Sequence, residues 1–131
     1  PFTFGLHPYF KVTDLSQIHI GGLSSKCLNH VNMQETDTDD QLTLLPEGVD
    51  FMANNSGMVT LVDLITGRSI QMQSQSPMDL PVVWTEPPRP MVCLEPWTSP
   101  RNALIDGNRL LLLKPGEKKQ LACRYEVLTN Q

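Results

Sequence analysis

The chain has 131 residues, of which 40% are hydrophobic and 18% charged, and its formal net charge is −4. This length suits one domain with its own core, and this composition is typical of a folded protein rather than a disordered one. The acidic balance argues against nucleic acid as a partner, because phosphate binding needs a basic stripe. No apolar run approaches the roughly 20 residues that cross a bilayer, and we find no signal-peptide pattern, so we expect no membrane partner.

Cysteine usage indicates the compartment and bears on metal binding. Cys27, Cys93 and Cys123 are an odd number without a close pair, which argues against a disulfide framework and favours a reducing, cytoplasmic location. Cys27 and His30 have a spacing found in zinc sites, but such a site needs three or four ligands and no second pair follows. The acidic run at 37–40 lacks the glycine and the late glutamate of a calcium loop. The sequence therefore predicts neither a metal site nor a cofactor.

Proline and glycine punctuate the chain, and between them the surviving pattern is short alternation rather than a helical period. Each alternating or β-branched run has the length of a strand. In chain order, the expected strands are 16–20, 57–63, 68–73, 81–85, 91–95, 108–114 and 119–127. Thr66–Gly67 is expected to turn the second of these strands back into the third. The polar, acidic segment 29–41 is expected to be a loop.

These runs predict an all-β fold. We count about eight to ten strands and expect under about a tenth of the chain in helix, against a general average of about a third. Strands separated by turns, without intervening helices, favour an antiparallel β-sandwich. We assign residues 1–131 to a single domain.

Three titratable residues are candidates for chemistry. Glu95 ends the apolar run 91–94, where desolvation raises the pKa of a carboxyl group and makes it a better base. His7, in the stretch Gly-Leu-His-Pro-Tyr-Phe, could be a general acid. Asp50, taken alone, is a weaker candidate for a functional residue than the other two. For each of them, an ordinary residue at a strand edge or in solvent is the competing interpretation.

His7, Asp50 and Glu95 are stronger candidates together than singly, because the sequence resembles the aldose 1-epimerases, or galactose-mutarotase-like proteins, including the hexose-6-phosphate mutarotase branch. The resemblance covers essentially the whole chain in the right order. It is carried by GLHPYF at 5–10, EGVDF at 47–51, VTLVD at 59–63, VVWT at 82–85, CLEPW at 93–97, PRNAL at 100–104 and LKPGE at 113–117.

The resemblance implies a reaction and its residues. It implies interconversion of the α and β anomers of a hexose or hexose phosphate, with His7 as general acid and Glu95 as general base. Asp50 would bind a sugar hydroxyl, and Trp97 or Trp84 would stack on the sugar's apolar face. The reaction needs no cofactor. We expect the acid and the base to face one cavity with room for a pyranose ring between them.

The resemblance also has limits. It covers the carboxy-terminal half of the family's β-sandwich, so an arginine and a further histidine that hold the sugar are expected in the absent half. Val82 stands where the galactose-specific branch carries glutamine. Unpaired strand edges predict a homo-oligomer or pairing with an N-terminal fragment. The alternative function is a non-catalytic carbohydrate-binding or structural β-sandwich fragment.

Overall fold

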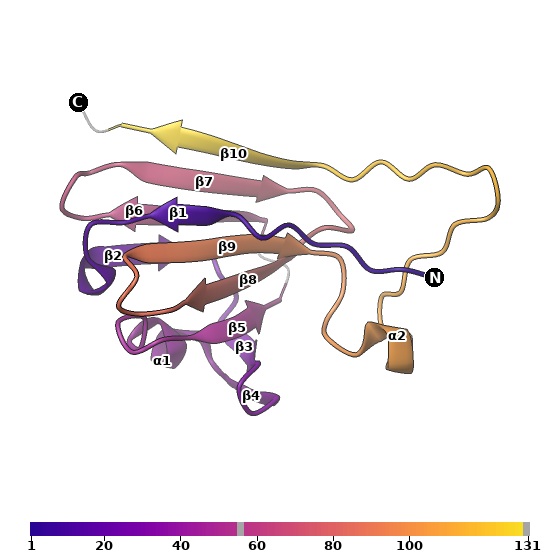
Figure 1. Ribbon diagram of the computed structural model, residues 1–131, viewed down its shortest axis with the longest axis horizontal. Helices are drawn as coiled ribbons and strands as arrows, with labels where there is room; N and C mark the ends of the chain where they lie inside the picture. The colour runs from indigo at the N-terminus through magenta and orange to yellow at the C-terminus, as the bar shows by residue number, and fades with distance from the viewer. Residues whose placement is uncertain (55–56, 130–131) are drawn as a thin grey trace.

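The computed structural model describes residues 1–54 and 57–129, and they form two antiparallel sheets (Figure 1). The larger sheet has the order β1 (Tyr9–Lys11), β9 (Met91–Trp97), β8 (Leu80–Thr85), β5 (Asp50–Ala53), β3 (Lys26–Asn29) and β4 (Gln34–Asp37). The smaller sheet has the order β10 (Cys123–Leu128), β7 (Ser69–Ser74), β6 (Met58–Asp63) and β2 (Ile18–Gly21). The all-β antiparallel sandwich predicted from the alternating runs is confirmed.

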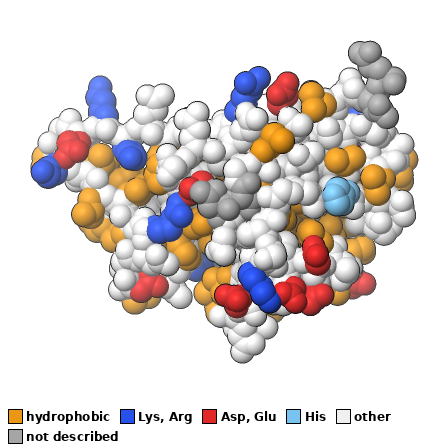
Figure 2. Space-filling view, turned by 180° about the vertical axis from the view of Figure 1, so that it is seen from behind, with side chains coloured by type: hydrophobic (Ala, Val, Ile, Leu, Met, Phe, Trp, Pro, Cys, Tyr) orange, Lys and Arg blue, Asp and Glu red, His pale blue; other side chains and the backbone are white. Residues whose placement is uncertain are grey.

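Helix is confined to short connections. They are η1 (Leu15–Gln17), α1 (Thr38–Leu42) and α2 (Ala103–Asp106), and helix makes up 9% of the structure. Among the described residues, no helix has the length and apolar character needed to cross a membrane. On the face seen in Figure 2, acidic and basic side chains are interspersed rather than gathered into a basic stripe.

The core lies between the two sheets and follows from the period of two along each strand. On the larger sheet, the inward positions include Phe51, Val83 and Leu94, which are all fully buried. On the smaller sheet, Val59 and Met72 face them. A side chain next to any of these in sequence points to the opposite side of its sheet, and that side of the larger sheet carries the polar candidates.

The segment 29–41, expected to be a loop, is instead a strand followed by a helix. β4 pairs with β3 through backbone hydrogen bonds, and α1 begins directly after it. β4 is an edge strand with no partner beyond it in its sheet, so its side chains need not be apolar, and hydrophobic alternation does not reveal it. The prediction of a loop was therefore wrong.

The strand expected at 108–114 is also absent. Its only ladder contact among the described residues is a single bridge between Phe2 and Leu111. Arg109 explains the difference, because its guanidinium donates to the carbonyl oxygens of Thr98 and Pro77 and pairs with Asp79. These bonds hold the segment beside the end of β9 rather than in a hairpin.

Tyr125 links the two sheets. Its hydroxyl donates to the carbonyl oxygen of Leu94 on β9 at 2.8 Å, and its ring packs against Phe10. We expect Tyr125→Phe to lower the free energy of unfolding by about 1 kcal/mol, because one partly buried hydrogen bond is lost. Urea titration measures the effect. Tyr9→Phe removes a hydroxyl from a side chain that is 57% exposed and should change stability by much less; equal losses in the two variants would contradict the assignment.

Candidate functional site

The pairing of β9 with its neighbours brings the candidate residues to one face of the larger sheet. Val92 and Leu94 point into the core, so Glu95 and Trp97 point to the other side. Tyr9 pairs with Cys93 and Gly5 with Trp97, which sets His7 opposite Glu95. On the other flank of β9, Glu95 lies opposite Val82, and one strand further Asp50 lies opposite Trp84.

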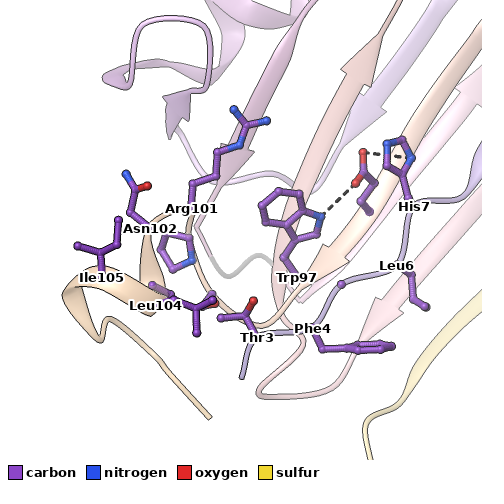
Figure 3. Close-up of a pocket in the computed structure, with 14 residues that line it drawn as sticks. Thr3, Phe4, Leu6, His7, Trp97, Arg101, Asn102, Leu104 and Ile105 are labelled. Atoms are coloured by element: carbon purple, nitrogen blue, oxygen red, sulfur yellow. Dashed lines mark hydrogen bonds and ion pairs between the residues drawn. The ribbon is translucent and has the colours of Figure 1, made fainter. Parts of the chain in front are cut away.

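His7 and Glu95 face each other directly. His7 Nδ1 lies 3.7 Å from Glu95 Oε2, with the His7 side chain 52% exposed and the Glu95 side chain 3% exposed. The other carboxylate oxygen, Oε1, accepts a hydrogen bond of 3.0 Å from Trp97 Nε1 (Figure 3). The histidine therefore has solvent access while the carboxylate is enclosed and fixed in orientation.

The separation differs from the expected room for a pyranose ring between acid and base. A gap of 3.7 Å holds no ring, so a sugar would lie over the pair rather than between its members. Chemistry requires no larger gap, because the anomeric hydroxyl and the ring oxygen of an aldose are bonded to the same carbon. Two groups close together can therefore reach both atoms.

The environment of Glu95 suits a proton acceptor. Burial raises the pKa of its carboxyl group, and the negative charge of Asp50 adds to this effect. The Trp97 hydrogen bond and the charges of His7 and His30 oppose the rise without cancelling it. A carboxylate with a raised pKa accepts a proton more readily at neutral pH than an ordinary glutamate does.

Asp50 is held by two basic residues. His30 Nδ1 lies 2.8 Å from Oδ1, and an Arg101 Nη donates to Oδ2 at 3.0 Å. Burial alone would raise the pKa of Asp50, but hydrogen bonds and charge from His30 and Arg101 outweigh it, so the pKa is lowered. Asp50 is thus a fixed, ionised carboxylate with lone pairs left to accept a hydroxyl.

A small cavity of about 260 Å³ joins these groups. It is lined by His7, Asp50, Val82, Trp84, Glu95, Trp97 and Arg101. A larger cleft of about 590 Å³ adjoins it and shares His7, Glu95, Trp97 and Arg101. In Figure 3 the Trp97 indole lies between Arg101 and the His7–Glu95 pair. All four residues predicted from the sequence to form the site therefore line one cavity.

Sequence reasoning missed His30 and Arg101 as site residues. In the sequence, His30 stands out only as half of a possible zinc pair with Cys27, but Cys27 belongs to the core cluster whereas His30 bonds to Asp50. Its ring also stacks on Trp97, with centroids 5.7 Å apart. Arg101 follows β9 by four positions, and a basic residue so close to the CLEPW stretch was the available signal.

Gly5 leaves room for the Trp97 indole. A Cβ at position 5 would lie 2.8 Å from Trp97 Cδ1, which is too close for the ring to stay in place. We expect Gly5→Ala to displace the indole, break its bond to Glu95 and change the tryptophan emission. Gly21→Ala, whose Cβ would meet nothing nearer than 3.4 Å, is the matched control. An unchanged emission spectrum in Gly5→Ala would show that the indole does not need this space.

Comparisons with solved structures support this architecture. The Slr1438 protein from Synechocystis sp. PCC 6803 matches with a TM-score of 0.89 and 25% identity, over 98% of this chain and 45% of that one. A protein from Escherichia coli K12, provisionally named an aldose 1-epimerase, matches with a TM-score of 0.72 and 19% identity, over 99% and 51%. HI1317 matches with a TM-score of 0.60 and 22% identity, over 72% and 39%.

The chain thus spans about half, or less, of the length of these similar structures. A comparison with curated protein sequences found no match. The family model for aldose 1-epimerase matches residues 1–126, which is nearly the whole chain. By this match, the chain belongs to the aldose 1-epimerase family.

Proposed function

We propose that this chain carries the acid–base centre of a mutarotase, which interconverts the α and β anomers of an aldose. The observation that carries the proposal is the buried carboxylate of Glu95 facing the half-exposed ring of His7 in a cavity shared with Asp50. Glu95 is the base, His7 the acid, and Asp50 the acceptor that orients the sugar through a hydroxyl group.

The reaction consists of two coupled proton transfers. Glu95 takes the proton of the anomeric hydroxyl while His7 gives a proton to the ring oxygen, and the bond between C1 and the ring oxygen breaks to leave an open-chain aldehyde. After rotation about the C1–C2 bond, the ring closes on the other face and both protons return. Each positioned acid or base typically contributes about 10²–10⁴ in rate. The side chains of Glu95 and His7 make both proton transfers, so the proposed mechanism needs no cofactor.

The groups that surround this pair support the proposed substrate class. The ionised Asp50 accepts hydrogen bonds from hydroxyl groups, and the Trp97 ring offers an apolar surface for the sugar's C–H face. These features support a hexose or hexose phosphate with a free anomeric hydroxyl. Cys27, Cys93 and Cys123 are all free, which supports the proposal of a reducing, cytoplasmic setting.

The alternative is a non-catalytic carbohydrate-binding or structural fragment that needs a partner chain. It is favoured by the chain's spanning only about half of similar structures. The strands at the sheet edges, β1 and β4 in one sheet and β10 and β2 in the other, support pairing with a second copy or with an N-terminal fragment. This alternative predicts sugar binding without faster anomer exchange.

Glu95→Gln separates the two functions. We expect this chain alone to accelerate the equilibration of freshly dissolved α-glucose or α-galactose weakly or not at all in a polarimeter, and to accelerate it clearly once an N-terminal fragment is supplied. Glu95→Gln should then lower the acceleration by at least about a hundredfold, because shape is kept and the base is lost. Glu86→Gln is the matched control, since Glu86 is about half exposed and pairs with Arg89.

Two outcomes would contradict the mutarotase proposal. One is acceleration that persists in Glu95→Gln. The other is sugar binding without acceleration, both alone and when an N-terminal fragment is supplied. Sedimentation of the same samples tests the association expected from the free strand edges.

The raised pKa of Glu95 predicts a pH dependence. Catalysis requires the deprotonated carboxylate, so the rate falls as pH drops through the pKa of Glu95. The usual pKa of a glutamate is about 4.3. Because the pKa of Glu95 is raised, the decline in rate should lie above that value. A pH–rate profile measured by polarimetry reports its position. Asp50→Asn removes a negative charge that raises the pKa of Glu95 and should move the decline to lower pH. A decline at the ordinary glutamate value in the parent chain would contradict the assigned base.

A further inference from the structure

Cys93 is a buried thiol residue beside the site for which the proposed mechanism has no use. It is fully buried, and its thiol lies beside the acid–base pair. One sulfur atom, one nitrogen atom and one oxygen atom, from Cys93, His7 and Glu95, lie within 4.8 Å of one another. Among the described residues, these three are the group of histidine, cysteine and carboxylate side chains that lie close enough together to hold a metal ion.

The strand register explains why these three side chains meet. Cys93 and Glu95 are two positions apart on β9 and so project from the same face of the sheet. Tyr9 of β1 pairs with Cys93, and the bridge from Gly5 to Trp97 continues that register, which sets His7 against Glu95. Tyr9 stacks on the His7 ring with centroids 5.0 Å apart. Two members of the cluster thus stand on β9, and His7 lies in the short stretch between the bridge at Gly5 and the start of β1.

The geometry is close to that of a zinc site. For three atoms at most 4.8 Å apart, a point exists within about 2.8 Å of all three. Zinc binds cysteine sulfur at about 2.3 Å and histidine nitrogen or carboxylate oxygen at about 2.0–2.2 Å. Side-chain shifts of under about 1 Å therefore reach coordination distances. Three protein ligands with a fourth position open to water is a common arrangement for a reactive zinc ion.

The donor set selects the kind of ion. A thiolate with an imidazole favours soft or borderline cations such as Zn²⁺, Co²⁺ or Cd²⁺, whereas Mg²⁺ and Ca²⁺ prefer oxygen ligands alone. The surroundings of Glu95 fit this role as well, because Trp97 Nε1 already holds one carboxylate oxygen and leaves the other toward His7. Hydrogen-bonded carboxylates of this kind are typical of metal ligands.

We propose that His7, Cys93 and Glu95 bind a thiophilic divalent cation, and that this ion excludes the sugar from the acid–base pair. On binding, the Cys93 thiol loses its proton to solvent and the sulfur bonds to the ion, so one proton is released for each ion bound. The ion occupies the electron pairs that His7 and Glu95 would use in proton transfer. The site would make the protein sensitive to inhibition by zinc.

Cobalt is the probe, because a bond from cobalt to thiolate sulfur gives a charge-transfer absorption band in the near ultraviolet. We expect one Co²⁺ per chain with this band, and its displacement by Zn²⁺. Cys93→Ser and Cys93→Ala should abolish the band. Cys27→Ser and Cys123→Ser are matched controls and should retain it, since Cys27 lies in the core and Cys123 packs against it. His7→Ala and Glu95→Gln should each weaken Co²⁺ binding by at least about tenfold.

Absence of the band in the parent chain would overturn the proposed site. A band that survives in His7→Ala and Glu95→Gln with unchanged affinity would overturn it too, because the ion would then be bound by a thiol alone. These spectra do not depend on mutarotase activity, so the site can stand if the proposed function fails. Glucose should raise the Co²⁺ concentration at half-saturation; no effect from glucose in a chain that accelerates anomer exchange would overturn the exclusion of sugar by the ion.

Discussion

The antiparallel pairing of β9 with β1 and β8 is the constraint on which the site depends. Along β9, residues alternate between the sandwich core and the opposite face, so Leu94 fills the core while Glu95 enters the cavity. A slip of one residue in register would exchange the two faces and bury a carboxylate among aliphatic side chains. The large apolar residues on one face therefore fix the position of the chemistry on the other.

Burial of the carboxylates explains why the site contains more polar partners than the reaction uses. A buried carboxylate without hydrogen bonds is costly, and each carboxylate here has its own donors. Trp97 is hydrogen-bonded to Glu95, while His30 and Arg101 are hydrogen-bonded to Asp50. These partners give the two carboxylates different properties, because Glu95 has a raised pKa and Asp50 a lowered one. One is suited to accepting a proton and the other to staying charged.

Much of this arrangement was predictable from the sequence. Alternation located β7, and runs of apolar or β-branched residues located β6, β8 and β9, all to within about a residue or two, because strands with buried faces need apolar side chains. The hairpin at Thr66–Gly67 was confirmed as well. The polar edge strand β4 was not predictable in this way, since backbone pairing leaves no hydrophobic pattern. The strand predicted around Arg109 does not form, because the Arg109 guanidinium bonds to carbonyl groups distant in sequence and these bonds take the place of a strand ladder.

The residues of the site were likewise predictable only in part. His7, Asp50 and Glu95 could be named because a short motif surrounds each of them, and the structure brings all three to one cavity. His30 and Arg101 could not be assigned to Asp50, because their contacts depend on how β3 sits beside β5 and where the loop after β9 turns. In that loop Asn102 adopts φ 70°, a left-handed conformation that no simple sequence pattern indicates.

The pairing of the chain's first residues with β9 has a consequence for folding. Phe4 and Thr98 exchange hydrogen bonds across 94 positions in the sequence, and His7 meets Glu95 through the same closure. Contacts of such sequence separation require the entropy of a long loop to be lost before they form, and proteins rich in them fold slowly. The hairpins β6–β7 and β8–β9 are local and can form without this closure. During synthesis, the His7–Glu95 pair cannot assemble until Glu95 has left the ribosome.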